Sequence, residues 1–206
     1  MHDVTGVILA GGESRRFGGV NKAFQRLGGV TMMDRVYAAV KSVCGKVVIV
    51  TNSPLDYLRW DAALVTDKFG FRGSLVGIHA GLAVAEGDYA FVTACDTPFL
   101  KKGVIEMVTG SIDDSIDIVV PEKGKWVEPL CAVYSKRCLK VIEEQLGRGE
   151  LVIKSIYGKL RVKKISEKQI RTVDPCLVSF VNVNTKQELE TAESLLASGN
   201  SSLTVG

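Results

Sequence analysis

Apolar and polar positions along this chain follow two alternating patterns. Short, continuous apolar runs predict buried strands at Val4–Leu9, Val47–Val50, Tyr89–Cys95, Ile118–Val120, Leu130–Tyr134 and Phe180–Val181. Apolar residues at helical spacing predict helices at Thr31–Val43, Ile78–Ala85, Val104–Val108, Ser135–Leu146 and Lys186–Ala197. Strands that alternate with helices predict an α/β fold, a Rossmann-like and mostly parallel sheet with helices on both faces.

Polar or glycine-rich segments follow three of the predicted strands. These segments are Gly11–Lys22, Thr51–Ser53 and Asp96–Thr97. In open sheets of this kind, ligands bind beyond the carboxyl ends of the strands. The sequence therefore predicts a binding site where the three segments meet.

Composition narrows the class of protein. The chain has 206 residues, of which 46% are apolar, and we expect a single domain over residues 1–198 with a disordered tail at 199–206. The net charge of +3 and the absence of a run of five like charges argue against a nucleic-acid partner. The five cysteines form no C-x-x-C pair, which argues against structural zinc and disulfides and favours a cytoplasmic protein. No apolar run reaches the roughly 20 residues of a membrane helix, so we expect no membrane partner.

The loop after the first predicted strand has the composition of a phosphate cradle. The paired glycines Gly11 and Gly12 allow backbone N–H groups to approach an anion closely, and Arg15, Arg16 and Lys22 add positive charge. The loop matches neither the P-loop pattern nor the dinucleotide-binding fingerprint. On composition alone, a plain turn with solvated arginines is an alternative interpretation.

Two further segments carry candidate chemistry. Asp96 ends a buried strand, where a carboxylate is a suitable ligand for Mg²⁺, although it could instead cap a helix beginning at Thr97–Pro98. Asn182 and Asn184 are two residues apart and would face one side of a strand, whereas a cap and turn is the alternative. We interpret four other residues as structural, namely His79, Cys95, Trp60 and Trp126.

The order of these residues resembles a known family more specifically than their composition does. The loop keeps the signature of the molybdenum cofactor guanylyltransferases at Leu9, Gly11, Gly12, Ser14, Arg16, Gly18 and Lys22. Further segments that are similar to that family are Asp67 with Gly73–Gly77, Asp96–Pro98, Pro129–Tyr134 and Asn182–Thr185. The resemblance extends over about residues 4 to 197.

The resemblance implies a fold, a reaction and a set of site residues. The fold is that of the nucleotide-diphospho-sugar transferases. The reaction is transfer of GMP from GTP to the terminal phosphate of molybdenum-molybdopterin, with Mg²⁺ as cofactor and pyrophosphate as the second product. It implies catalytic roles for Arg16, Lys22 and Asp96, with Asp96 as the metal ligand. It assigns nucleotide binding to Leu9, Ala10, Gly11, Gly12, Lys22, Asn52, Asp67, Gly77 and Asp96, and acceptor binding to Asn182 and Asn184.

The same resemblance suggests partners and shows departures. GTP and molybdopterin are the expected partners, together with other molybdenum cofactor biosynthesis proteins or recipient molybdoenzymes. Ser74 stands where the family has proline, Glu128 stands where a neutral residue or histidine is common, and Gly149–Ile153 lacks an arginine pair often found there. The last two departures bear on the acceptor, whereas Ser74 bears on the conformation of its loop.

Two alternatives remain from the sequence. Cytidylyltransferases acting on the same pterin resemble this chain but typically have Leu-Ala-Ala-Gly and Asp-Gln-Pro, so Gly11 and Thr97 favour guanine. The missing Cβ at Gly11 leaves room for a larger base, and backbone groups of Leu9 and Ala10 are expected to pair with its edge. A non-catalytic nucleotide-binding module is the second alternative, and the presence of both Lys22 and Asp96 argues against it.

Overall fold

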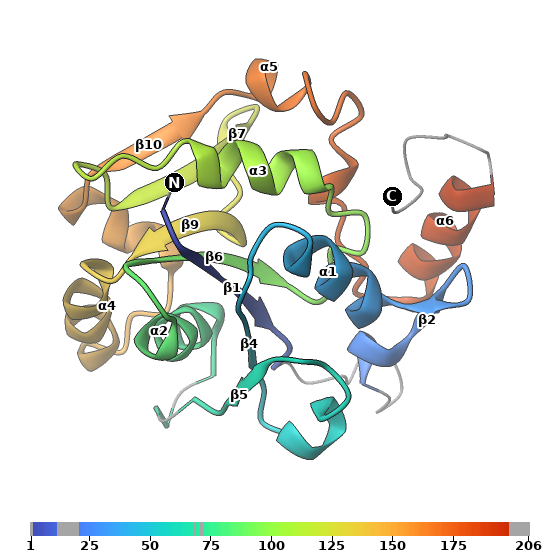
Figure 1. Cartoon of the computed structure of the whole chain (residues 1–206), viewed down its shortest axis with the longest axis horizontal. Helices are drawn as coiled ribbons and strands as arrows, with labels where there is room; N and C mark the ends of the chain where they lie inside the picture. Colours follow the sequence, from blue (N-terminus) through green and yellow to red (C-terminus); the bar gives the residue numbers. More distant parts are fainter. Residues whose placement is uncertain (1, 12–20, 68, 71, 198–206) are drawn as a thin grey trace.

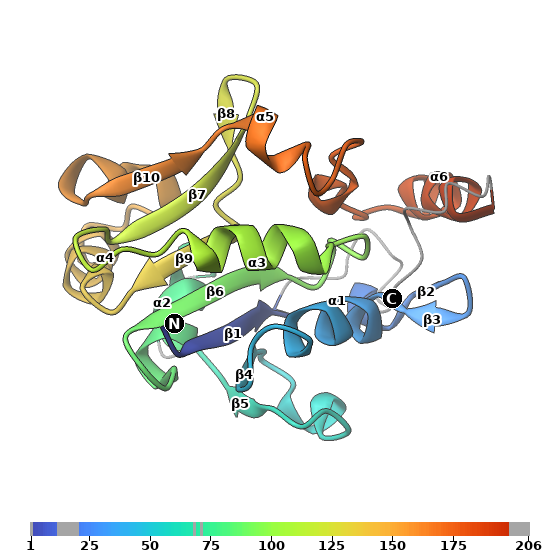
Figure 2. The same cartoon turned by 45° about the horizontal axis from the view of Figure 1, so that its top comes forward.

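A computed structural model describes residues 2–11, 21–67, 69–70 and 72–197. Its strands are β1 (Val4–Leu9), β4 (Val47–Val50), β5 (Ala63–Val65), β6 (Tyr89–Ala94), β7 (Ile118–Lys123), β8 (Trp126–Val127), β9 (Cys131–Ser135) and β10 (Val162–Ile165). They form an eight-stranded sheet in the order β10-β7-β9-β6-β1-β4-β5 (Figure 1), with β8 paired to β7 (Figure 2). The tail predicted at 199–206 lies outside the described residues.

The sheet is mostly parallel. β1 runs parallel to both β4 and β6, and the pairs β4–β5 and β7–β10 are also parallel. β9 is antiparallel to its neighbours β6 and β7, and β8 is antiparallel to β7. The predicted mostly parallel sheet is therefore confirmed, with β9 as an antiparallel strand inside it.

Helices cover both faces of this sheet, as predicted. They are α1 (Met32–Lys41), α2 (Ser74–Val84), α3 (Lys102–Gly110), α4 (Cys138–Gly147), α5 (Glu167–Ile170) and α6 (Lys186–Ala197). The alternation of side chains along β1 divides the core: Ile8 packs in the cluster that holds α1 and α3, whereas Val7 and Leu9 pack with α2 and α4 (Figure 2). None of these helices is long and apolar enough to cross a membrane.

Two glycines allow the helices to lie close to β1. A Cβ on Gly6 would be 2.2 Å from Cγ1 of Val40 in α1, and a Cβ on Gly81 in α2 would be 2.3 Å from Cγ1 of Val7. Real Cβ atoms do not approach other atoms this closely, so each position requires glycine. The close packing fixes where α1 and α2 begin relative to the carboxyl end of β1.

A small layer beside the sheet supports the segment that carries Lys22. The 3-10 helix η2 (Lys22–Phe24) leads into a hairpin of β2 (Arg26–Leu27) and β3 (Val30–Thr31), and α6 lies beside this hairpin (Figures 1 and 2). The Gly28 N–H donates to Glu193 Oε1 of α6 at 2.9 Å. A third apolar cluster joins the hairpin to α6 through Leu27, Met32, Phe99, Val178, Val183 and Ala192. The C-terminal helix is thus attached next to Lys22.

The predicted strand at Phe180–Val181 is wrong. Residues Val178–Phe180 form the 3-10 helix η5, which begins after Leu177 at φ 54°. The Ser179 N–H donates to the buried Asp174 carboxylate at 2.8 Å, which holds the turn in place of a strand ladder. Phe180 is buried all the same, so an apolar pair alone did not distinguish a strand from a buried turn.

Other boundaries differ from the prediction in small ways. α4 begins at Cys138 because Ser135 still pairs with Tyr89 as the last residue of β9. The edge strands β5 and β10 were not predicted, since β5 has three residues and β10 carries two exposed lysines. α1 begins after its N-cap Thr31, whose hydroxyl accepts a hydrogen bond from the Asp34 N–H.

Candidate functional site

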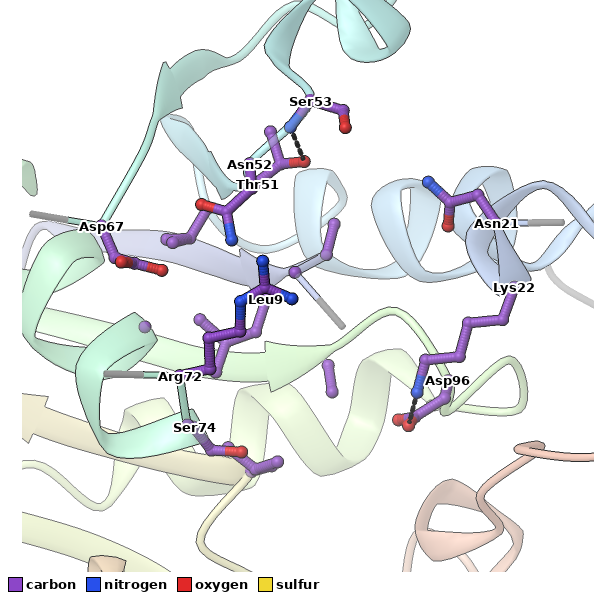
Figure 3. A pocket seen from close by; sticks show the side chains of 17 residues that line it. Leu9, Asn21, Lys22, Thr51, Asn52, Ser53, Asp67, Arg72, Ser74 and Asp96 are labelled. Carbon is purple, nitrogen blue, oxygen red and sulfur yellow. Dashed lines mark hydrogen bonds and ion pairs between the residues drawn. The ribbon is translucent and has the colours of Figure 1, made fainter. Parts of the chain in front are cut away.

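A pocket of about 810 Å³ lies at the carboxyl ends of β1, β4 and β6 (Figure 3). Leu9 pairs in register with Val50 on one side and with Ala94 on the other, so the three strands end side by side. All three of these residues line the pocket. The polar segments that follow them are therefore brought to one place, as the sequence predicted.

The structure brings most of the predicted nucleotide-binding residues to this pocket. Those that line it are Leu9, Ala10, Gly11, Lys22, Asn52, Asp67, Gly77 and Asp96. Gly12 and Arg16 lie outside the described residues. The lining also includes residues to which the sequence analysis gave no role, namely Asn21, Val50, Thr51, Ser53, Arg72, Gly73, Ser74, Ala94 and Leu130.

A buried hydrogen-bond network orients Lys22. Asn21 caps the short helix η2 by accepting from the Ala23 N–H at 3.1 Å, and its amide donates to the Tyr57 hydroxyl at 3.0 Å. That hydroxyl in turn donates to the Ala10 carbonyl at 3.3 Å. Burial raises the pKa of Tyr57 to about 12, so the hydroxyl keeps its proton and remains a donor. The start of η2 is thus tied to the end of β1.

The Lys22 ammonium lies between two side-chain oxygens from distant parts of the chain. Its Nζ is 2.5 Å from Asp96 Oδ2 and 3.0 Å from Asn184 Oδ1 (Figure 3 shows the Asp96 contact). The side chains of Lys22 and Asp96 are 24% and 14% exposed, so solvent reaches both. Both groups are therefore accessible to a ligand that enters the pocket.

Asp96 does not cap the following helix, which was the alternative interpretation. α3 begins only at Lys102, and residues between them form a turn in which the Leu100 N–H donates to the Thr97 carbonyl at 3.1 Å. The Thr97 hydroxyl points back and donates to the Ala94 carbonyl at 2.9 Å. The Asp96 carboxylate is directed to the pocket instead, where Lys22 contacts it.

The segment that carries Asn182 and Asn184 reaches the site without forming a strand. The Val183 N–H donates to the Asp96 carbonyl at 2.8 Å, which places Asn184 beside Lys22. Asn182 is exposed, and neither asparagine lines the pocket. The expectation that both face one side of a strand is wrong. The side chain that caps α6 is that of Thr185, whose hydroxyl accepts from the Glu188 N–H at 3.1 Å, while the Asn184 N–H donates to Glu188 Oε2 at 2.7 Å. The Asn184 side chain contacts Lys22 and does not cap the helix.

A buried ion pair holds this segment against the Asp96 turn. Lys101 Nζ lies 3.2 Å from Oδ1 of Asp174, whose side chain is fully buried. The Ser179 hydroxyl accepts from the Lys101 N–H at 3.1 Å. Both contacts connect the start of α3 with the turn before Asn184. They therefore hold Asp96 and Asn184 in a fixed relative position.

Polar side chains of a different kind gather at the other end of the pocket. Figure 3 shows Asn52, Asp67 and Arg72 there, away from the pair of Lys22 and Asp96. This end offers carboxylate, amide and guanidinium groups, which suit hydrogen bonding to the edge of a base. Asn52 and Asp67 follow β4 and β5, whereas Arg72 precedes α2.

Backbone groups near the end of β1 are largely engaged by the sheet. The Ala10 N–H donates to the Val50 carbonyl at 2.8 Å, and the Leu9 carbonyl accepts from the Cys95 N–H at 3.1 Å. The Ala10 carbonyl accepts from the Tyr57 hydroxyl. The carbonyls of Leu9 and Ala10 therefore have only their second lone pairs left for the expected pairing with a base, whereas Asn52 and Asp67 at the far end present a side-chain amide and a carboxylate.

The start of α2 contributes to the same wall. Gly73 and Ser74 line the pocket, and the N-cap residue Gly73 makes no side-chain capping bond. Unpaired N–H groups and the positive end of a helix dipole favour an anion. Ser74 begins α2 where the sequence analysis noted a missing proline, so the helix start is kept without it.

The carboxylates of the described residues do not form a closed metal site. No group of three His, Cys, Asp or Glu side chains comes together in the part of the chain that the structure describes. Asp96 is the carboxylate beside Lys22. A single carboxylate at a triphosphate site fits a divalent cation that takes its other ligands from phosphate oxygens and water.

The residues interpreted as structural behave as predicted with one exception. His79 in α2 is paired with Glu143 at 2.9 Å, and burial raises the pKa of Cys95 to about 12. Trp60 is buried and donates from Nε1 to Asp34 at 3.1 Å. The prediction for Trp126 is wrong, because this side chain is 69% exposed.

Comparisons with known proteins agree with this geometry. The family described as "MobA-like NTP transferase domain" matches residues 6–164. A molybdenum cofactor guanylyltransferase from Desulfosudis oleivorans is 65% identical over 199 residues, which are 97% of this chain and 98% of that protein. The crystal structure of molybdopterin-guanine dinucleotide biosynthesis protein A from Archaeoglobus fulgidus superposes with a TM-score of 0.82 at 28% identity, covering 95% of this chain and all of that one.

A more distant structure shares the fold alone. The 2-C-methyl-D-erythritol 4-phosphate cytidylyltransferase from Thermus thermophilus has a TM-score of 0.71 at 17% identity over 95% of this chain and 99% of its own. The predicted nucleotide-diphospho-sugar transferase-like fold is confirmed by these neighbours.

Proposed function

This chain belongs to the MobA-like NTP transferase family, and from that premise we propose that it transfers GMP from GTP to the terminal phosphate of molybdenum-molybdopterin. The products are the guanine dinucleotide form of the cofactor and pyrophosphate. GTP and molybdopterin are its small-molecule partners. The observation that carries the proposal is the cluster of Lys22, Asp96 and Asn184 at one end of a pocket whose other end presents base-reading groups.

The two ends of the pocket bind different parts of the nucleotide. The triphosphate binds beside Lys22, whereas the helix start at Gly73 and Ser74 directly follows Arg72 and adds N–H donors to the far end of the pocket. Guanine binds at the far end. Its N1–H and amino group are donors suited to the Asp67 carboxylate, whereas its O6 and N7 are acceptors suited to the Arg72 guanidinium. Adenine and cytosine lack this arrangement of donors and acceptors.

The reaction requires positioning and charge stabilisation rather than a covalent intermediate. An oxygen of the acceptor phosphate attacks the α-phosphorus, a new P–O bond forms, and the bond to the bridging oxygen of pyrophosphate breaks. Pyrophosphate leaves with that electron pair. The Lys22 ammonium offsets the negative charge that grows on the transferred and leaving groups. Arg16 is proposed to act in the same way, although it lies outside the described residues.

Magnesium is the proposed cofactor. Asp96 is the residue that would hold Mg²⁺, because its carboxylate lies in the pocket beside Lys22 and is partly open to solvent. When bound, the ion neutralises triphosphate charge and draws electron density from the phosphorus. Asn184 keeps Lys22 in place through its 3.0 Å contact, and we propose that it and Asn182 lie on the acceptor side of the site.

A nucleotide panel tests the proposal. Purified protein is given GTP, CTP or ATP with molybdopterin and Mg²⁺, and both pyrophosphate and dinucleotide are measured. We expect kcat/KM for GTP to exceed that for CTP and ATP by a large factor, since a site built to bond one base can reject another by about 10⁴-fold. Equal or better use of CTP would select the cytidylyltransferase alternative. Tight GTP binding without pyrophosphate release would select the non-catalytic module.

A further inference from the structure

The hairpin between β7 and β9 presents an exposed aromatic side chain. In β8, Val127 packs into the core with α2 and α4, so its neighbour Trp126 points to the opposite side. The Trp126 side chain is 69% exposed, whereas Trp60 is 7% exposed. An exposed indole has a free face that is available to a flat ligand.

One lysine lies over this indole, and two further charged residues lie near Trp126 along the hairpin. Lys154 Nζ lies 4.8 Å from the centre of the Trp126 ring, and Lys123 pairs with Trp126 across the hairpin. Glu128 is two residues after Trp126 and half-buried. Desolvation raises the pKa of Glu128, and the positive charges of Lys123 and Lys154 oppose that rise. We call Lys123, Trp126, Glu128 and Lys154 the rim cluster.

Two independent connections join the rim cluster to the nucleotide pocket. The first is the chain itself, since Leu130 lines the pocket and four residues of chain span at most about 14 Å between it and Trp126. The second runs through Leu151, three residues before Lys154. A Cβ on the pocket residue Gly73 would lie 3.7 Å from Cβ of Leu151, so these residues are in contact. The rim cluster is thus an extension of the pocket wall.

We propose that the rim cluster binds the pterin ring system of the acceptor. Trp126 stacks on the flat heterocycle, Glu128 accepts from its exocyclic amino group and adjacent ring N–H, and the lysines offset the acceptor's negative charge. This inference rests on the proposed function, which requires an acceptor phosphate near Lys22. A phosphorylated pterin fits because it combines a stackable ring, a donor edge for a carboxylate and an anionic end directed to the pocket.

The chemistry of the rim cluster distinguishes this ligand from a second nucleotide. A carboxylate that faces the edge of a ring selects neighbouring N–H donors, which pterins present through the amino group and the ring nitrogen beside it. Glu128 is half-buried, so its carboxylate would gain from neighbouring N–H donors on a bound ring.

Binding of a stable pterin tests the proposal without turnover. The probe is 6-hydroxymethylpterin phosphate, whose own fluorescence anisotropy reports binding to the full chain. We expect Trp126→Ala to raise the Kd between about 5-fold and 100-fold, the range seen when an aromatic partner of a nucleobase is removed, and Trp126→Phe to raise it much less. Glu128→Gln should also raise the Kd, because an amide replaces one acceptor oxygen with a donor. Leu55→Ala is the matched control, since Leu55 is 80% exposed and does not line the pocket.

Steady-state kinetics separate this inference from the proposed function. In Trp126→Ala the KM for molybdopterin should rise, whereas the KM for GTP should change by less than about 2-fold because Trp126 does not line the nucleotide pocket. A wild-type protein that binds the probe but forms no dinucleotide would refute the proposed function and leave the rim cluster standing. Dinucleotide formation with an unchanged acceptor KM and an unchanged probe Kd in Trp126→Ala would overturn the rim cluster alone.

Discussion

Replacing Asp96 by Asn tests the catalytic end of the pocket, because it removes a charge and keeps the size of the side chain. Lys22 retains Asn184 Oδ1 at 3.0 Å and is 24% exposed, so water can compensate for part of the lost ion pair. We therefore expect the loss in the free energy of unfolding to be about 1–2 kcal/mol. For a chain of this length, that corresponds to a fall in Tm of roughly 2–8 °C, and the protein should remain folded.

Activity should fall far more than stability. Loss of one group that stabilises the transition state typically lowers kcat by about 10²–10³-fold, which is equivalent to roughly 2.7–4 kcal/mol. The assay is pyrophosphate release at saturating GTP, molybdopterin and Mg²⁺, with thermal unfolding of the same sample. Asp67→Asn is the matched control, because Asp67 lies at the opposite end of the pocket and its loss should raise the KM for GTP more than it lowers kcat. Near-normal kcat in Asp96→Asn would refute the assignment of Asp96 to the metal.

Three further substitutions have distinct expected results. Lys22→Ala should lower kcat/KM for GTP much more than Arg15→Ala, because the Lys22 ammonium contacts two side-chain oxygens at the site. Equal losses in the two variants would indicate that the loop acts only as a diffuse positive patch. Gly11→Ala should raise the KM for GTP while leaving Tm unchanged, since among the described atoms an added Cβ meets only a backbone carbonyl at 3.9 Å; an unchanged KM would contradict the proposed place of the base. The Arg161 guanidinium, with a second arginine, holds the pKa of Asp117 well below its usual range. Because the pKa of Asp117 is lower in the folded state, its ion pairs stabilise the fold above the unfolded pKa of about 3.9, and this stabilisation is lost as the pH falls below that value. Between pH 7 and 3, the free energy of unfolding in urea should therefore fall less in Asp117→Asn than in the unsubstituted protein. Identical pH profiles for the two proteins would refute this role of Asp117.

The central sheet was predictable because its strands are buried on both faces and read as continuous apolar runs. β1, β4 and β6 all have uniformly buried residues, and each was predicted within a residue of its observed bounds. The Phe180–Val181 prediction failed because Phe180 is buried as part of a turn, which Asp174 holds by accepting a hydrogen bond from the Ser179 N–H. Long-range contacts of that kind leave no periodic signal in the sequence.

The site was predictable where backbone topology decides the position. Residues directly after the strands, such as Asn52 and Asp96, reach the pocket because the carboxyl ends of parallel strands meet at one edge. Arg72 was missed because it follows no predicted strand, and it reaches the pocket from the loop before α2. Trp126 was missed because tryptophan is more often packed than exposed, and only the pairing of β8 with β7 shows which way it points.

The fate of the α-phosphate of GTP tests the central claim most directly. Protein, molybdenum-loaded molybdopterin and Mg²⁺ are incubated with GTP labelled at the α-phosphorus, and the products are separated by chromatography. The proposed function predicts that the label appears in the pterin guanine dinucleotide, in amounts equal to the pyrophosphate released. Label recovered only in GTP or in free GMP, with no labelled dinucleotide, would contradict it.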